Sequence, residues 1–168
     1  GLYAGAAQAQ AVSIGALPQG SLSYSVAAAV AKVIGDKTDI TTRAIGVGGT
    51  NIYIPQVDQN KLQMSTAAVT DAIFAANGTG SFAGRAHKNL RVLARMLEFQ
   101  TGFMVKNSSS IRRLSDFKGK KFPSGFTAQK LVGTLVTAAF ATEGMTFKDV
   151  KGVLVPNFAK ATDAMVAG

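Results

Sequence analysis

The sequence predicts an α/β fold with a largely parallel sheet, built as two lobes. Segments typical of strands alternate with segments typical of helices along the 168 residues. Hydrophobic residues make up 47% of the chain and charged residues 16%, which is enough apolar material for a folded core. The charge is uneven: residues 1–84 carry four basic and four acidic side chains, whereas residues 85–168 carry 14 basic and five acidic ones. This asymmetry indicates two lobes, of which the second favours anionic partners.

Residues 1–11 are set apart from the fold by their composition. Both Ala7-Gln8-Ala9 and Ala9-Gln10-Ala11 fit the small-x-small pattern that signal peptidase accepts. We therefore expect residues 1–11 to be the remnant of a signal peptide, and the protein to work outside the cytoplasm. The alternative is an alanine-rich chain end that frays.

The first half is expected to contain three strands and three helices. Short apolar or alternating runs predict strands at residues 12–17, 39–47 and 61–66. Apolar residues recur at helical spacing from Leu22, which predicts a helix that Ser21 caps and Gly35 ends. A second helix is expected from Asn51, with Pro55 limiting its length. A third is expected over residues 67–76, ended by Asn77-Gly78.

The second half repeats the alternation. Apolar runs predict strands at residues 90–97, 103–106, 120–124 and 152–155. A short helix with a basic face is expected at residues 111–117, and the longest helical pattern covers residues 127–143 and is closed by Gly144. A last helix is expected from Ala159.

Three loops follow predicted strands and precede predicted helices, at residues 15–21, 46–50 and 124–127. In parallel sheets, ligands bind beyond the carboxyl ends of the strands. Each loop offers small residues and free backbone N–H groups, and a helix start carries roughly half a positive charge. We therefore expect these loops to form an anion or carboxylate site that needs no charged side chain.

Several chemistries are disfavoured. The chain has no cysteine, which excludes disulfides, zinc–cysteine sites, iron–sulfur clusters and thiol catalysis. Residues 15–21 have the spacing of a phosphate-binding P-loop, but Ser21 stands where the lysine belongs. His87 is the one histidine and is expected to be solvated, and no His/Asp/Glu cluster has metal-ligand spacing. We therefore expect the protein to bind no metal and no cofactor, and we do not expect it to be an enzyme.

The basic second half is expected to be a solvated face rather than a nucleic-acid surface. No aromatic residues interleave with its basic clusters, as a base-stacking platform requires. Docking onto an acidic or membrane-embedded partner remains an alternative reading.

Four motifs, in order, resemble a known family. Residues 111–120 resemble the opening of the second lobe in type 2 periplasmic binding proteins. Residues 15–24 resemble the first loop of the TRAP-associated extracytoplasmic immunogenic (TAXI) receptors, the solute-binding subunits of TRAP transporters. Residues 48–51 resemble their second loop, and Ser65-Thr66 the polar pair that ends their third strand.

The sequence departs from that family at four places. Ser21 replaces a glycine, Ser23 replaces a tyrosine, and Ala67 stands where the family usually has aspartate. The glycine-rich loop of the second lobe is shortened to residues 124–127. These changes concern the ligand more than the fold.

The resemblance implies a type 2 periplasmic-binding-protein-like architecture with lobes at residues 12–100 and 101–168. Receptors of this type are close to twice as long, so we expect the chain to be truncated within the second lobe. The implied function is a periplasmic solute-binding protein that captures a small organic acid or amino acid between its lobes, and delivers this anionic or zwitterionic solute to the membrane subunits of a TRAP transporter. The residues expected to bind the solute are Gly20, Ser21, Tyr24, Gly49, Thr50, Asn51, Ser65, Thr66, Gly125, Phe126 and Thr127.

Two alternatives belong to other classes of protein. The same architecture serves as the effector-binding domain of transcription regulators, in which a DNA-binding helix-turn-helix would precede it. An enzyme whose catalytic groups lie beyond Gly168 is the other alternative.

Overall fold

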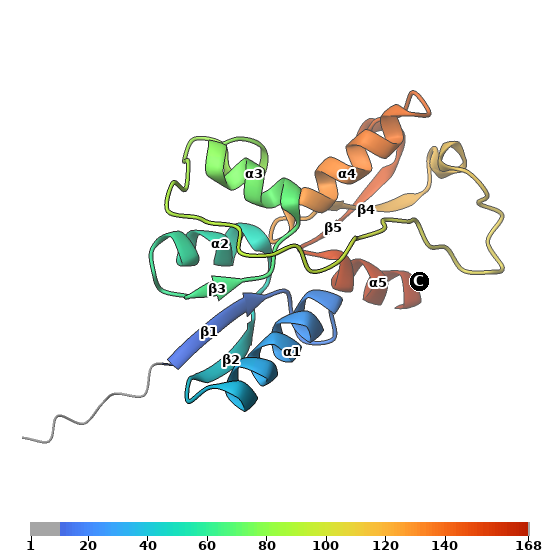
Figure 1. The fold of residues 1–168 in the computed structure, drawn as a ribbon. Coiled ribbons are helices and arrows are strands. Elements are labelled where there is room, and N and C mark those ends of the chain that lie inside the picture. Colours follow the sequence, from blue (N-terminus) through green and yellow to red (C-terminus); the bar gives the residue numbers. More distant parts are fainter. Residues whose placement is uncertain (1–10, 168) are drawn as a thin grey trace, which may run out of the picture.

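A computed structural model describes residues 11–167, which form two parallel sheets with helices packed on them (Figure 1). The predicted signal-peptide remnant lies outside these residues except for Ala11, which begins the first strand. The α/β fold with parallel sheets in two parts confirms the predicted fold class. None of the helices within residues 11–167 has the length and apolar character needed to cross a membrane.

The first part contains a three-stranded sheet in the order β2-β1-β3. Its strands are β1 (Ala11–Ala16), β2 (Thr41–Gly46) and β3 (Met64–Ser65). Its helices are α1 (Leu22–Lys37), α2 (Thr50–Asp58), α3 (Val69–Asn77) and the short 3₁₀ helix η1 (Gly80–Phe82). Both strand pairs are parallel, with Ala16 beside Gly46 and Gly15 beside Ser65, so all three strands end at one edge.

The alternation of side chains along β1 distributes the helices over the two faces of this sheet. Ile14 and Ala16 pack with Ala27 of α1 in one buried cluster. Gly15 points the other way, and a Cβ atom there would lie 2.8 Å from Leu62 Cδ1 and 3.4 Å from the Tyr53 side chain. A side chain at this position would therefore displace Leu62, which follows α2.

The helix ends agree only in part with those predicted from the sequence. Ser21 caps α1, since its hydroxyl accepts the Tyr24 N–H at 3.1 Å, and Gly78 ends α3 with a φ of 66°. Gly35 does not end α1, which runs to Lys37. The prediction was wrong because Gly35 is not in the left-handed conformation that ends a helix. Pro55 lies inside α2, which nevertheless continues to Asp58.

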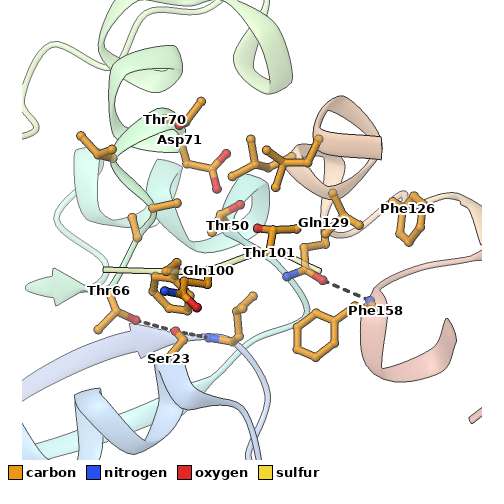
Figure 2. Close-up of a pocket in the computed structure, with 18 of the residues that line it drawn as sticks. Ser23, Thr50, Thr66, Thr70, Asp71, Gln100, Thr101, Phe126, Gln129 and Phe158 are labelled. Carbon is orange, nitrogen blue, oxygen red and sulfur yellow. Dashed lines mark hydrogen bonds between the residues drawn. The ribbon is translucent and has the colours of Figure 1, made fainter. Parts of the chain in front are cut away.

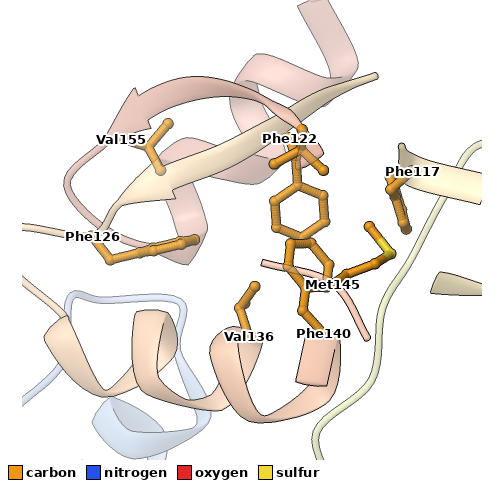
Figure 3. Close-up of a cluster of buried hydrophobic side chains, with 8 residues drawn as sticks. Phe117, Phe122, Phe126, Val136, Phe140, Met145 and Val155 are labelled. Carbon is orange, nitrogen blue, oxygen red and sulfur yellow. The ribbon is translucent and has the colours of Figure 1, made fainter. Parts of the chain in front are cut away.

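The second part contains the parallel pair β4 (Lys121–Gly125) and β5 (Lys151–Val155). Its helices are η2 (Leu114–Phe117), α4 (Lys130–Ala141), η3 (Phe147–Asp149) and α5 (Phe158–Ala167). An aromatic core joins them (Figure 3): the Phe122 ring lies 4.9 Å from that of Phe140 and 5.0 Å from that of Phe117. Such ring pairs stabilise a core beyond their buried area.

The predicted strands at residues 90–97 and 103–106 are not strands in the structure. This segment crosses from the first part to the second without regular secondary structure (Figure 1). Its apolar side chains are largely exposed, and Leu93 has 80% of its surface accessible. Apolar sequence favours an extended chain, but a strand also requires a neighbour, and none of the described strands pairs with this segment.

Candidate ligand-binding cleft

The carboxyl ends of the strands in both parts open onto one cleft. β1, β2 and β3 lead into the N-termini of α1, α2 and α3, and β4 and β5 lead into α4 and α5. The cleft has a volume of about 2140 Å³ and is lined by residues of both parts, with the segment 90–106 along it. Its polar side chains gather near the ends of β1 and β3 and the start of α4 (Figure 2).

A hydrogen-bonded group forms the first-part wall. The Ser23 and Thr66 hydroxyls lie 2.7 Å apart, and Ser23 Oγ also accepts the Leu17 N–H at 3.2 Å (Figure 2). The buried Tyr53 hydroxyl donates to the Thr66 carbonyl at 2.8 Å. Burial raises the pKa of Tyr53 far above its ordinary value, so the phenol stays protonated and remains a donor. These bonds fix the end of β3 against α1 and α2.

An acidic side chain lies in the same wall. Asp71, in the first turn of α3, is only 1% exposed, and its Oδ1 atom has no hydrogen-bond partner among residues 11–167. Burial raises the pKa of Asp71, and the nearby Thr50 hydroxyl partly offsets that rise. In Figure 2 the carboxylate points toward Thr50, whose buried Oγ1 is also without a partner in the described chain.

The second-part wall is built around the turn between β4 and α4. Gly125 and Phe126 both have left-handed backbone, with φ of 83° and 44°, which is strained for phenylalanine. This turn buries the Phe126 ring in the core of the second part. The buried Gln129 side chain follows, and its Oε1 accepts the Phe158 N–H at 3.2 Å. The amide nitrogen of Gln129 is therefore the end that faces the cleft (Figure 2).

The two parts touch beside the cleft. Asn51 Nδ2 donates to the Thr127 carbonyl at 3.4 Å. A Cβ atom on Gly49 would lie 1.3 Å from the Ala128 carbonyl oxygen, so only glycine permits this approach. Backbone of the second part therefore packs directly against the second glycine-rich loop, residues 46–50.

The structure distributes the eleven predicted ligand-binding residues over several places. Four of them line the large cleft: Thr50, Ser65, Thr66 and Phe126. Gly20 and Ser21 instead line a separate cavity of about 240 Å³ between the loop after β1 and the start of α5.

The other five line neither of these two cavities. Gly49, Asn51 and Thr127 lie where the two parts touch, and Gly125 lies at the end of β4. Tyr24 packs against the cluster formed by β1 and α1, because helix geometry turns its side chain toward the sheet.

Sequence reasoning missed Ser23, Asp71 and Gln129 as cleft residues. Asp71 left a signal: it is the one charged residue within the apolar stretch 67–76. Ser23 and Gln129 left none, because nothing in the residue types distinguishes them from exposed helix residues.

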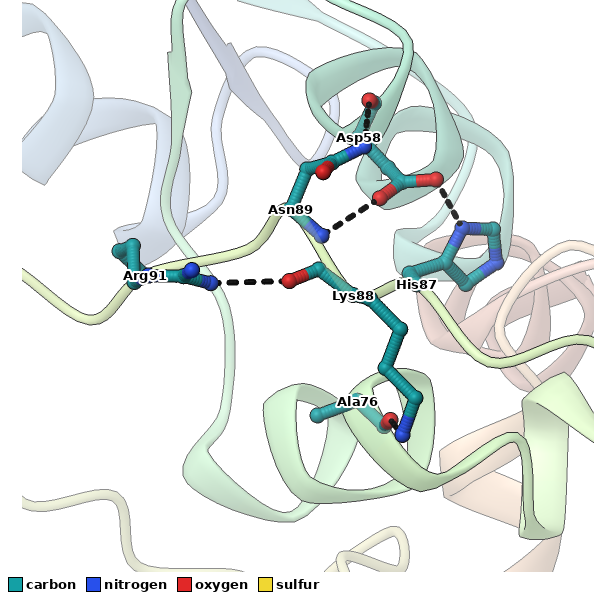
Figure 4. A network of polar contacts seen from close by, with 6 residues as sticks. All are labelled: Asp58, Ala76, His87, Lys88, Asn89 and Arg91. Carbon is teal, nitrogen blue, oxygen red and sulfur yellow. Dashed lines mark hydrogen bonds and ion pairs between the residues drawn. The ribbon is translucent and has the colours of Figure 1, made fainter.

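His87 is buried rather than solvated, so that expectation was wrong. Its Nδ1 lies 3.0 Å from Asp58 Oδ2, and the Asn89 N–H donates to Asp58 Oδ1 at 3.1 Å (Figure 4). The hydrogen bond from His87 holds the pKa of Asp58 below its usual range. This network joins the loop after η1 to the end of α2. The burial of His87 could not be predicted locally, because its partner Asp58 lies 29 residues away in the sequence.

The described residues contain no group of three or more His, Cys, Asp or Glu side chains placed to hold a metal ion. Hydroxyls, amides, the buried Asp71 carboxylate and charged side chains, most of them on the segment 90–106, therefore supply the chemistry of the cleft, which suits binding a small polar solute.

Comparison with known proteins assigns the family. No curated protein matches the chain. A family model, described as the NMT1-like family, matches residues 14–168, which include both sheets except the first three residues of β1, and the cleft between them. This family consists of binding proteins and is related to TAXI and other periplasmic-binding-protein-like solute receptors. The match covers nearly the whole sequence, and the chain therefore belongs to the NMT1-like family.

Proposed function

We propose that this protein is the extracytoplasmic solute-binding subunit of a TRAP-type transporter, of the TAXI type. It captures a small organic acid or amino acid in the cleft and delivers it to the membrane subunits. One observation carries the proposal: the carboxyl edges of two parallel sheets open onto a single cleft, where uncharged polar side chains such as Thr66 and Gln129 line the strand ends. Ligands of open α/β sheets bind at such edges.

The two lobes of the proposed receptor are residues 12–100 and 101–168. The contact of Gly49 with Ala128 gives them a common point about which the cleft closes. A closing cleft surrounds a small solute and removes it from water, which strengthens each polar contact.

Polar groups at the strand ends hold the solute. Ser65 ends β3 and Thr66 follows it, and the uncapped start of α3 directs free N–H groups to the same space. Gln129 contributes an amide from the opposite wall. These donors are neutral, so binding a carboxylate here does not require an arginine or lysine to be desolvated.

Titration calorimetry of the intact two-lobed protein against monocarboxylates, dicarboxylates and amino acids tests this proposal. We expect saturable binding of at least one of them. Thr66→Val should weaken that binding about 3- to 10-fold, the usual effect of one lost hydrogen bond.

Ser25→Ala is the matched control, because Ser25 lies on α1 two positions from Ser23 and its hydroxyl bonds only the Ser21 carbonyl at the exposed surface. It should leave affinity unchanged. If none of the solutes binds, or if both variants behave alike, the proposed function is wrong.

A further inference from the structure

Asp71 is a buried carboxylate with unfulfilled bonding capacity. The residue is 1% exposed, and its Oδ1 has no hydrogen-bond partner among residues 11–167. A buried polar atom without a partner costs about 1–3 kcal/mol, more if it is charged. Few native groups are left in that state, and those that are call for an explanation.

Thr50 carries a second such atom in the same place. Its buried Oγ1 is also without a partner in the described chain, and Figure 2 shows the Asp71 carboxylate pointing toward it. The two side chains come from the first turns of α2 and α3, and both line the large cleft. The Thr50 hydroxyl lies close enough to lower the pKa of Asp71, yet each side chain keeps a buried oxygen without a hydrogen-bond partner in the described chain, which indicates the position of a ligand group.

The chemistry of these atoms selects that group. An ionised carboxylate only accepts hydrogen bonds, and an ammonium group offers three donors. The start of α3 favours the ionised form of Asp71, since negative charge is stabilised in the first turn of a helix. A protonated amine would satisfy Asp71 and Thr50 together, whereas a second carboxylate would repel Asp71.

The surroundings fit the rest of such a solute. Leu17, Ile54 and Met64 line the same cleft and give it apolar surface. Neutral donors, Thr66 and the Gln129 amide, remain for a carboxylate at the other end of the solute.

We propose that Asp71 and Thr50 bind the protonated amine of the solute, so that the cleft takes a small zwitterionic amino acid rather than a simple organic acid. This inference rests on the proposed solute-binding function. It adds a cation-binding position opposite the neutral donors that would hold the carboxylate.

Matched pairs of probes test the inference on the intact two-lobed protein by calorimetry. Each pair differs only in an amino against a hydroxyl group: alanine and lactate, leucine and 2-hydroxy-4-methylpentanoate, phenylalanine and phenyllactate, glutamate and 2-hydroxyglutarate. We expect the amino member to bind about 10-fold or more tightly in each pair that binds, as expected for a desolvated charge pair.

Asp71→Asn keeps the shape of the side chain and removes its charge. It should weaken the amino member about 30-fold or more, and leave the hydroxy member unchanged or tighter. Asp36→Asn is the matched control, since Asp36 is exposed on α1 and pairs with Lys32 at the surface. Circular dichroism confirms folding, and if Asp71→Asn does not fold, the comparison of pairs on the unmodified chain decides.

The outcomes separate the two proposals. If hydroxy acids bind as well as amino acids, or if Asp71→Asn affects both alike, the amine position is wrong and solute binding stands. If no probe binds, the solute-binding function is overturned together with this inference.

Discussion

Asp58 and Asp71 are two carboxyl groups of the first part whose pKa values move in opposite directions. Burial raises that of Asp71, and the hydrogen bond from His87 lowers that of Asp58. The ordinary value for aspartate in an unfolded chain is about 3.9. A raised value in the folded protein means that ionisation destabilises the fold, and a lowered value means that it stabilises the fold.

Asp71→Asn should therefore stabilise the protein without a solute by about 1–3 kcal/mol at neutral pH, because it removes an unpaired buried charge. The gain should vanish as the pH falls below about 4, where Asp71 is protonated in both states. Thermal unfolding between pH 3 and 8 measures this. If Asp71→Asn is only as stable as the unmodified protein at pH 7, then the ionised Asp71 carboxylate does not destabilise the fold.

Asp58→Asn should have the opposite effect on stability and lower the free energy of unfolding. The Asp58 carboxylate stabilises the fold above about pH 4, and this contribution is lost as the pH falls through its lowered folded pKa. At neutral pH we expect a loss of about 1 kcal/mol, the value of a typical hydrogen bond. The same unfolding series measures it, and a loss that persists undiminished at the acid end would contradict the assignment.

At the scale of elements, the start of α1 is set by Ser21, whose hydroxyl accepts the Tyr24 N–H. Ser21→Ala should lower the free energy of unfolding by about 1 kcal/mol, whereas Ser21→Asp should retain it because aspartate caps equally well. Chemical denaturation distinguishes the two variants. Equal stability of all three proteins would show that the cap contributes nothing.

Ser21→Asp also tests the first loop as a carboxylate site. It adds negative charge at the start of α1 and should weaken the binding of anionic solutes. Calorimetry with the solutes that bind the unmodified chain gives the answer. Unchanged affinity would remove this loop, and the small cavity beside it, from the binding site.

At the scale of the whole molecule, Gly49 determines how closely the two parts approach. A methyl group there would overlap the Ala128 carbonyl, so Gly49→Ala must move backbone. We expect it to separate the parts, with a larger radius of gyration in X-ray scattering and weaker solute binding.

Gly48→Ala is its matched control. A Cβ at that position would lie 3.4 Å from Ile52 Cδ1 and 3.7 Å from Ala128 Cβ, which are ordinary contacts. It should leave size and affinity unchanged. If the two alanine variants behave alike, the contact of Gly49 with Ala128 does not hold the parts together.

Local patterns predicted much of this protein. The starts of β1 and α1, the end of α3 at Gly78 and the strand β5 follow from neighbouring residues, because apolar periodicity and capping act within a few positions. From these elements came the α/β class and the prediction that strand ends form the site. The lobe boundaries and the full set of ligand-binding residues stay predictions.

The tertiary structure decided what depends on distant partners. Residues 90–97 have strand-like sequence but no neighbouring strand, and His87 is buried because Asp58 lies beside it. Gly49 meets Ala128 across 79 positions of the chain, and Asp71 faces the cleft because α2 and α3 start at the same sheet edge. The sequence by itself determined most of the helices and strands, since periodicity and capping are local; residues 90–97 and 103–106 are the exceptions. Only the folded chain determined which side chains meet, since pairing and burial are decided between segments far apart in the sequence.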